Sequence, residues 1–117
     1  MLSIEAIIKP ERVNQVVAAL EAVGCKGFYY FNVTGQGGQG GVEVLVGRGG
    51  RTAGRSAVPK TLVRTIIDES MKDSVVEAII GSARSPGEGA IGDGKIFITE
   101  IQEAIRVRTG EKGIDAI

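Results

Sequence analysis

The sequence predicts one α+β domain of the ferredoxin-like type, a βαββαβ sandwich in which an antiparallel sheet carries both helices on one face. Each half of the chain shows a β-type pattern, then a helical pattern, then a second β-type pattern. A single glycine-rich segment, Gly35 to Pro59, separates the two halves. The 117 residues, 43% of them hydrophobic, suffice for one core, whereas each half alone is too small to hold one well. We therefore expect residues 1–117 to fold as a single domain.

The first half contains a strand, a helix and a second strand. Residues Leu2 to Lys9 alternate largely between apolar and polar side chains, which is typical of a half-buried strand. Pro10 suits the first turn of a helix, and Gly24 ends the helical pattern. The apolar residues with helical spacing are Val13, Val16, Val17, Leu20 and Val23. Residues Lys26 to Val33 are rich in aromatic side chains and form the second predicted strand.

The second half repeats this order after the glycine-rich segment. A third strand is expected beyond Pro59, ending at Asp68. The residues Ser70 to Asp73 fit a capping box that would start a second helix. The apolar positions of that helix are Val75, Val76, Ile79, Ile80 and Ala83. The breaker sequence Ser85 to Gly89 ends it.

The end of the chain supplies the last strands. Residues Lys95 to Ile101 form the fourth predicted strand, Ile105 to Arg108 a short further strand, and residues 109–117 a polar tail. Such a sheet leaves its other face uncovered. Because an exposed apolar sheet face is a liability, we expect oligomerisation to bury it.

The segment from Gly35 to Pro59 holds nine of the eighteen glycines. Each glycine loses more backbone entropy on ordering than any other residue, so a long, mobile and exposed loop is expected between the second and third strands. A loop of this length in a compact chain is uncommon unless it has a function or is a linker.

Composition excludes several classes of function. Lys plus Arg and Asp plus Glu both number 14, so no overall charge argues for a nucleic-acid partner. No apolar run reaches the ~20 residues of a membrane span, and the N-terminus has no signal-peptide pattern, so a cytoplasmic location is expected. Histidine is absent and Cys25 is the only cysteine, which excludes disulfides, Cys/His zinc sites and histidine-activated nucleophiles. We expect Cys25 to be a small buried hydrophobic residue.

Two glycine motifs resemble phosphate-binding sequences. Gly35 to Gly40 satisfies G-x-G-x-x-G after a predicted strand, but no helix follows, which disfavours a dinucleotide-binding unit. Gly89 to Lys95 satisfies G-x-x-x-x-G-K, but Ile96 replaces the magnesium-binding Ser/Thr and a strand follows. Consecutive N–H groups in a glycine turn can still bind an anion, with Arg106 and Arg108 adding positive charge. The alternative is a tight turn with solvated basic side chains.

The chain resembles the PII signal-transduction proteins over nearly its whole length. The matching segments are IEAIIKPERV (Ile4–Val13), VTGQGGQGG (Val33–Gly41), VPKT (Val58–Thr61), VVEAII (Val75–Ile80), IGDGKIF (Ile91–Phe97) and IRVRTGEKG-DAI (Ile105–Ile117). The combination of IGDGKIF with IRVRTGE is highly specific.

This resemblance implies a homotrimer that binds ATP or ADP, magnesium and 2-oxoglutarate in clefts between subunits. It implies a regulator rather than an enzyme, acting on an ammonium channel or an enzyme of nitrogen assimilation through loop residues 42–58. The implied nucleotide-binding residues are Ile7, Gly35, Gly37, Gly38, Gln39, Ile66, Gly92, Asp93, Gly94, Lys95 and, from the neighbouring subunit, Arg106 and Arg108. The implied 2-oxoglutarate ligands are Gln39, Gly41 and Lys60, and Gln39 would also bind magnesium.

The chain departs from the family pattern in its loops. Gly38 stands where relatives commonly have an arginine, Gly40 stands where they have a lysine, and no tyrosine follows Tyr30 for uridylylation. The turn from Ser85 to Ile91 contains an extra Pro-Gly-Glu-Gly. Two alternatives stay open: a PII-like nucleotide sensor without a 2-oxoglutarate response, regulating carbon or metal transport, and a small nucleotide hydrolase using Asp93.

Overall fold

A computed structural model describes residues 1–36, 43–46, 51–54 and 57–117. Its strands are β1 (Leu2–Ile8), β2 (Phe28–Gly35), β3 (Glu43–Val46), β4 (Arg51–Gly54), β5 (Val58–Ile67) and β6 (Gly94–Glu100). Its α-helices are α1 (Val13–Ala22) and α2 (Lys72–Ala83). Short 3-10 helices are η1 (Pro10–Arg12), η2 (Glu69–Met71) and η3 (Gly113–Ala116).

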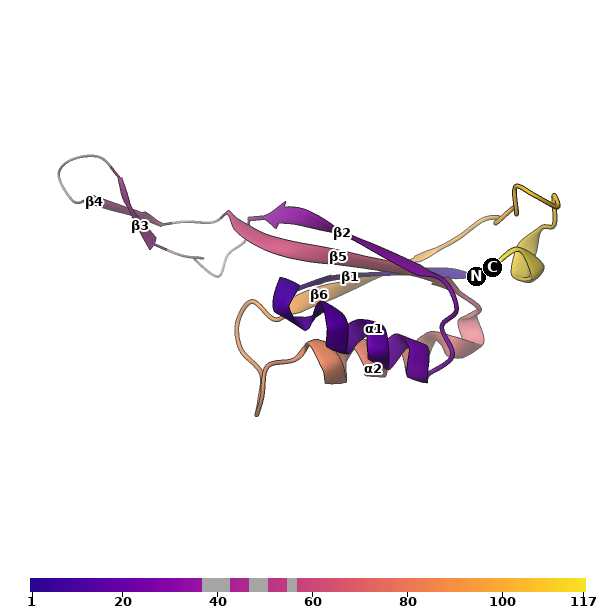
Figure 1. Ribbon diagram of the computed structural model, residues 1–117, viewed down its shortest axis with the longest axis horizontal. Helices are drawn as coiled ribbons and strands as arrows, with labels where there is room; N and C mark the ends of the chain where they lie inside the picture. The colour runs from indigo at the N-terminus through magenta and orange to yellow at the C-terminus, as the bar shows by residue number, and fades with distance from the viewer. Residues whose placement is uncertain (37–42, 47–50, 55–56) are drawn as a thin grey trace.

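The main sheet has four strands in the order β2-β5-β1-β6, and all its neighbours are antiparallel. Figure 1 shows α1 and α2 side by side on one face of this sheet. This arrangement confirms the predicted ferredoxin-like α+β fold.

The core lies between the sheet and the two helices. Alternate residues of β1 are buried there because they point toward the helices, and Ile4 and Ile8 are each only 1% exposed. They pack in one cluster with Val16 of α1 and Val75 of α2. Full burial of such a side chain contributes roughly 1.5–3 kcal/mol, so these helix positions anchor both helices to the sheet. Cys25 belongs to the same cluster, and burial raises the pKa of its thiol, which confirms it as a buried hydrophobic residue.

The opposite face of the sheet, here called the open face, carries none of the helices that the structure describes (Figure 1). The strand register places Tyr29, Arg64, Glu5 and Phe97 in one row across all four strands. Arg64 donates hydrogen bonds to Glu5 Oε2 at 2.6 and 3.0 Å and to the Tyr29 hydroxyl at 3.1 Å. Tyr29, Phe31 and Phe97 are 49%, 45% and 50% exposed. The predicted uncovered face is thus present, with aromatic side chains on it.

Parts of the glycine-rich segment, which was predicted as a long exposed loop, are paired as strands. At its base, β2 and β5 continue until Gly35 pairs with Val58, and further out β3 pairs with β4. Figure 1 shows this β3–β4 hairpin beyond the end of the main sheet. Glu43 to Val46 is rich in valine, a strong strand former. This local preference favours a strand here, although glycines flank the segment.

The predicted capping box at Ser70 is wrong. Asp68 takes the N-cap position in an extended conformation, and no side chain caps η2 or α2. The Ser70 hydroxyl instead donates to Asp68 Oδ2 at 2.8 Å, because Ser70 already lies inside the turn. Helix α2 follows directly from this 3-10 turn.

The predicted strand from Ile105 to Arg108 is also wrong. Only an isolated bridge between Ile105 and Lys112 forms there. The Gly110 N–H donates to the Arg106 carbonyl at 2.8 Å, and Gly110 has φ +71°, so the chain turns back before a strand can extend.

No helix among the described residues is long and apolar enough to cross a membrane.

Candidate functional site

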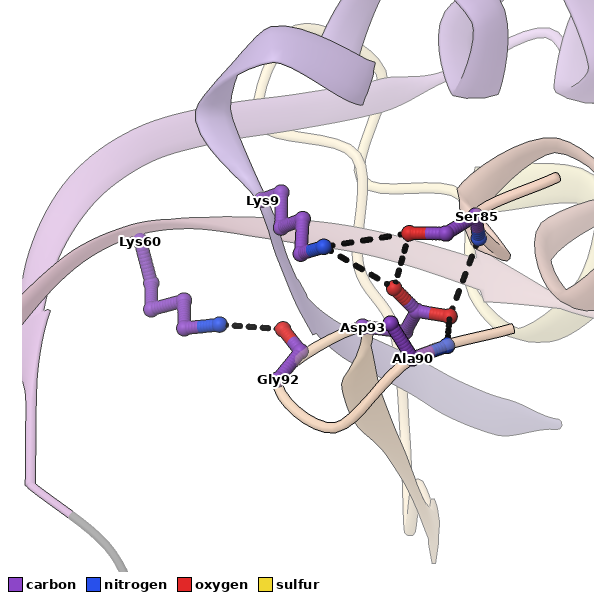
Figure 2. Close-up of polar contacts among 6 residues, drawn as sticks. All are labelled: Lys9, Lys60, Ser85, Ala90, Gly92 and Asp93. Carbon is purple, nitrogen blue, oxygen red and sulfur yellow. Dashed lines mark hydrogen bonds and ion pairs between the residues drawn. The ribbon is translucent and has the colours of Figure 1, made fainter. Parts of the chain in front are cut away.

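The turn between α2 and β6 is organised by the carboxylate of Asp93 (Figure 2). Its Oδ2 accepts the backbone N–H groups of Ser85 and Ala90, both at 2.9 Å. Its Oδ1 accepts the Ser85 hydroxyl at 2.5 Å and lies 3.2 Å from Lys9 Nζ. The Ser85 hydroxyl, followed by the two backbone N–H groups and Lys9, holds the pKa of Asp93 far below its ordinary value. Asp93 is therefore ionised, and its charge is satisfied within the chain.

Glycines let this turn meet the end of β1 closely. Gly92 and Gly94 have φ of +97° and +127°, a region that other residues rarely adopt. A Cβ added at Gly94 would lie 1.9 Å from the carbonyl oxygen of Ile7. A side chain at Gly94 is thus excluded by a backbone atom, so Gly94 fixes the turn against β1.

Lys60 connects the neighbouring strand β5 to the same turn. It is only 7% exposed, and its ammonium group donates a hydrogen bond to the carbonyl oxygen of Gly92 (Figure 2). Gly35 lies beside its stem, since a Cβ at Gly35 would be 3.4 Å from Lys60 Cγ. Lys95 follows the turn and pairs with Ile7 of β1.

One end of the sheet therefore gathers seven of the residues that the sequence singled out. We call them the turn group. They are Ile7, Gly35, Lys60, Gly92, Asp93, Gly94 and Lys95.

The remaining described candidates lie at the other end of the sheet. Ile66 pairs with Ser3, at the opposite end of β1 from Ile7. At about 3.3 Å per residue, four residues of strand separate these positions by about 13 Å. Arg106 and Arg108 belong to the C-terminal segment, which Figure 1 shows in yellow at the end opposite to the α2–β6 turn. One chain thus does not bring Ile66, Arg106 and Arg108 to the turn group.

The two arginines do not lie on a strand, because the predicted strand from Ile105 to Arg108 does not form. The Arg106 guanidinium donates to the Asp115 carbonyl at 3.0 Å and lies 3.6 Å from Glu111 Oε1. The candidates Gly37, Gly38, Gln39 and Gly41 lie outside the described residues, as do residues 42, 47–50 and 55–56 of the predicted partner-binding loop, residues 42–58.

Sequence reasoning missed two residues that help to build the candidate site. Lys9 and Ser85 lie 76 positions apart, yet Lys9 Nζ donates to Ser85 Oγ at 3.0 Å and both contact Asp93. The only signal was positional: Lys9 ends the first strand and Ser85 ends the second helical pattern. No local spacing rule connects these two ends.

The geometry limits what the site can do chemically. A carboxylate whose lone pairs are taken and whose pKa is depressed is a poor general base at neutral pH, so Asp93 does not support the hydrolase alternative. The described residues contain no group of three or more His, Cys, Asp or Glu placed to hold a metal ion. The charge of Asp93, the acid of the glycine turn, is already balanced by its own partners. Lys60 and Lys95 beside this turn are therefore suited to binding an anion.

Comparison with known proteins gives one consistent result. A family model described as "Nitrogen regulatory protein P-II" matches residues 1–111. The chain is 43% identical over 118 residues to "Nitrogen regulatory protein P-II 2" of Methanothermobacter thermautotrophicus, covering 100% of this chain and 97% of that protein. It is 41% identical over 117 residues to "Nitrogen regulatory protein P-II" of Rhodobacter capsulatus, with both chains fully covered.

A solved structure agrees with these relatives. Arabidopsis thaliana PII bound to citrate superimposes with a TM-score of 0.77 at 33% identity, covering 99% of this chain and 91% of the other. These relatives are named as regulatory proteins. The chain belongs to the nitrogen regulatory protein P-II family.

Proposed function

We propose that the protein is a homotrimeric signal-transduction regulator that binds ATP or ADP and 2-oxoglutarate between neighbouring copies. One observation carries this proposal: the candidate ligand-binding residues lie in two sets at opposite ends of a single sheet. A complete site then needs the turn group of one copy and Ile66, Arg106 and Arg108 of the next.

The open face supports assembly of this kind. Its aromatic side chains Tyr29, Phe31 and Phe97 are about half exposed, and no helix or strand among the described residues covers this face. Packing copies through this face would bury apolar area, which is the main favourable term in association. A symmetric ring of copies would then repeat the same composite site at each junction.

The charges of the two sets suit polyanionic ligands. Lys60 and Lys95 at one end, with Arg106 and Arg108 at the other, could balance a nucleotide polyphosphate and a dicarboxylate. Magnesium would be held by Gln39 together with oxygen atoms of the ligands. Lys60 would pair with a carboxylate of 2-oxoglutarate in place of the Gly92 carbonyl. The similar Arabidopsis PII structure is bound to citrate, which is another polycarboxylate.

The output of this regulator would be the loop between β2 and β5. Its base lies next to the turn group, because Gly35 and Lys60 are in contact range, so ligand binding there could change how the loop leaves the sheet. The loop, residues 42–58, would dock on a target in nitrogen metabolism, either an ammonium channel or an assimilation enzyme.

A second candidate is a nucleotide sensor without a 2-oxoglutarate response, which would regulate carbon or metal transport. The specific observation in its favour is the Lys60–Gly92 hydrogen bond, because it already satisfies the buried ammonium group without a ligand carboxylate.

Calorimetric titration of the full chain separates the two candidates. The leading proposal predicts ATP binding, and 2-oxoglutarate binding that is stronger with Mg-ATP than without it. The Lys60→Met variant should lose the 2-oxoglutarate response, whereas the exposed control Lys72→Met should keep it. Absence of ATP binding would refute both candidates, and ATP binding with no 2-oxoglutarate response would favour the second.

A further inference from the structure

We propose that Asp93 is a positioning residue for phosphate binding, which closes the α2–β6 turn at its base and holds Gly92 to Lys95 independently of the protruding residues 86–88. This inference rests on the proposed function. Asp93 itself would not touch the ligand.

The closure is visible in the hydrogen bonds to one oxygen atom. The N–H groups of Ser85 and Ala90 both donate to Asp93 Oδ2 at 2.9 Å, so their nitrogen atoms lie within about 6 Å of each other. The four residues between Ser85 and Ala90 must therefore form a loop whose two ends lie close together. Pro86, Gly87 and Glu88 are exposed, as expected for a small protrusion outside this closure.

Three further contacts fix the residues after the closure. The Asp93 N–H donates to the Ala90 carbonyl at 3.2 Å, and Lys60 binds the Gly92 carbonyl. Lys9, at the end of β1, ties the carboxylate to the sheet (Figure 2). The backbone before Lys95 is thus held from the turn and from two strands, whereas residues 86–88 take no part in these contacts. Gly89 belongs to the closure, because it has φ +85° and a Cβ added there would lie 2.9 Å from Asp93 Oδ2.

Electrostatics and positioning predict opposite effects for one substitution. If Asp93 acted only as a negative charge near an anion site, Asp93→Asn would strengthen anion binding. If Asp93 positions the turn, the same change places an amide NH₂ against donor groups, and binding weakens because the turn loses its fixed shape. Glu88→Gln is the matched control, since it removes a carboxylate from the same turn without removing a described contact.

The experiment titrates the full chain and its variants with ATP by calorimetry. We expect Asp93→Asn to bind about tenfold more weakly or worse, by analogy with the loss of groups that orient a ligand-binding shell. Glu88→Gln and a variant with residues 86–89 replaced by one glycine should stay within about threefold of the parent. Ser85→Ala keeps both N–H contacts and loses one hydroxyl, so its ATP affinity should lie between those of the parent and Asp93→Asn. This variant replaces Asp93→Asn in the test if Asp93→Asn does not fold.

Hydrogen exchange of the amides of residues 90–95 provides a readout that needs no ligand. The inference predicts faster exchange in Asp93→Asn and unchanged exchange in the shortened variant. Unchanged or tighter ATP binding by a folded Asp93→Asn protein would overturn it, as would equal loss of binding in the shortened variant. If the parent chain binds no ATP, the proposed function fails, and unchanged exchange in Asp93→Asn would then overturn the positioning role separately.

Discussion

The two ends of the main sheet differ in how completely one chain builds them. At the turn end, Asp93, Lys9 and Ser85 form a closed set of contacts, and Lys60 is buried against Gly92. At the C-terminal end, Arg106 makes a 3.6 Å ion pair with Glu111, and Val107 beside it is 99% exposed. The turn end has a fixed shape, whereas the C-terminal end offers cations on an exposed surface. Under the proposed function, the second set would gain a binding geometry by meeting the first set of another copy.

The largest expected effect comes from breaking the turn end. Gly94→Ala places a Cβ 1.9 Å from the Ile7 carbonyl oxygen at a φ of +127°. We expect a loss of unfolding free energy on the order of 3 kcal/mol or more, measured by urea denaturation.

The matched control for this change is Gly27→Ala. No heavy atom lies within 4 Å of a Cβ built there, so its unfolding free energy should change by only about 0.5 kcal/mol. Equal stability of the two variants would contradict the close approach of the turn to β1.

The next effect concerns how the two ends are brought together. Phe31→Lys introduces a charge into the open face at a side chain that is 45% exposed. If copies pack through this face, the mass measured by light scattering should fall from that of a trimer toward that of a monomer.

Ile80→Lys tests whether the effect is specific to the open face. Ile80 lies on α2, on the other side of the sheet, and is 39% exposed. This variant should keep the parent mass. A trimeric Phe31→Lys protein would rule out the open face as the assembly surface.

The smallest effect is the pH dependence of the turn end. Because the folded state lowers the pKa of Asp93 below its unfolded value of about 3.9, its stabilisation is complete above about pH 5 and is lost progressively at lower pH. The stability difference between the parent and Asp93→Asn should be the same at pH 7 and pH 5. At pH 3 it should be smaller, and a difference that already shrinks between pH 7 and pH 5 would contradict the depressed pKa.

Much of the fold could be predicted because the patterns are set by burial within one chain. The alternation of β1 reflects one face on the core, and the spacing of Val75 and Ile79 reflects one face of α2. The segment from Ile105 to Arg108 misled for a related reason: its alternation is that of a strand, but one chain provides no extended partner beside it among the described residues. Alternation of side chains depends only on neighbouring residues in the sequence, whereas strand pairing depends on a partner segment elsewhere in the chain.

For the candidate site, the sequence indicated residue types, whereas the contacts between the residues could not be predicted. Glycine and lysine in the sequence IGDGK indicated an anion turn, and the structure places them together with Lys60. The closure by Ser85 and Lys9 was not predictable, because it depends on how α2 ends beside β1. The resemblance implies that Asp93 helps to hold the nucleotide, which stays a prediction, and the structure shows its side chain bonded within the turn.

The most direct test of the composite site mixes two defective proteins. One carries Lys95→Gln in the turn group, and the other carries Arg106→Gln with Arg108→Gln at the opposite end. Each alone should bind ATP much more weakly than the parent. Mixed trimers, formed by coexpression and purified with two tags, should recover about one intact site in three, where an unmodified turn group meets unmodified arginines. Recovery of binding at this level is the predicted result, and absence of any recovery in folded mixed trimers would contradict a site shared between copies.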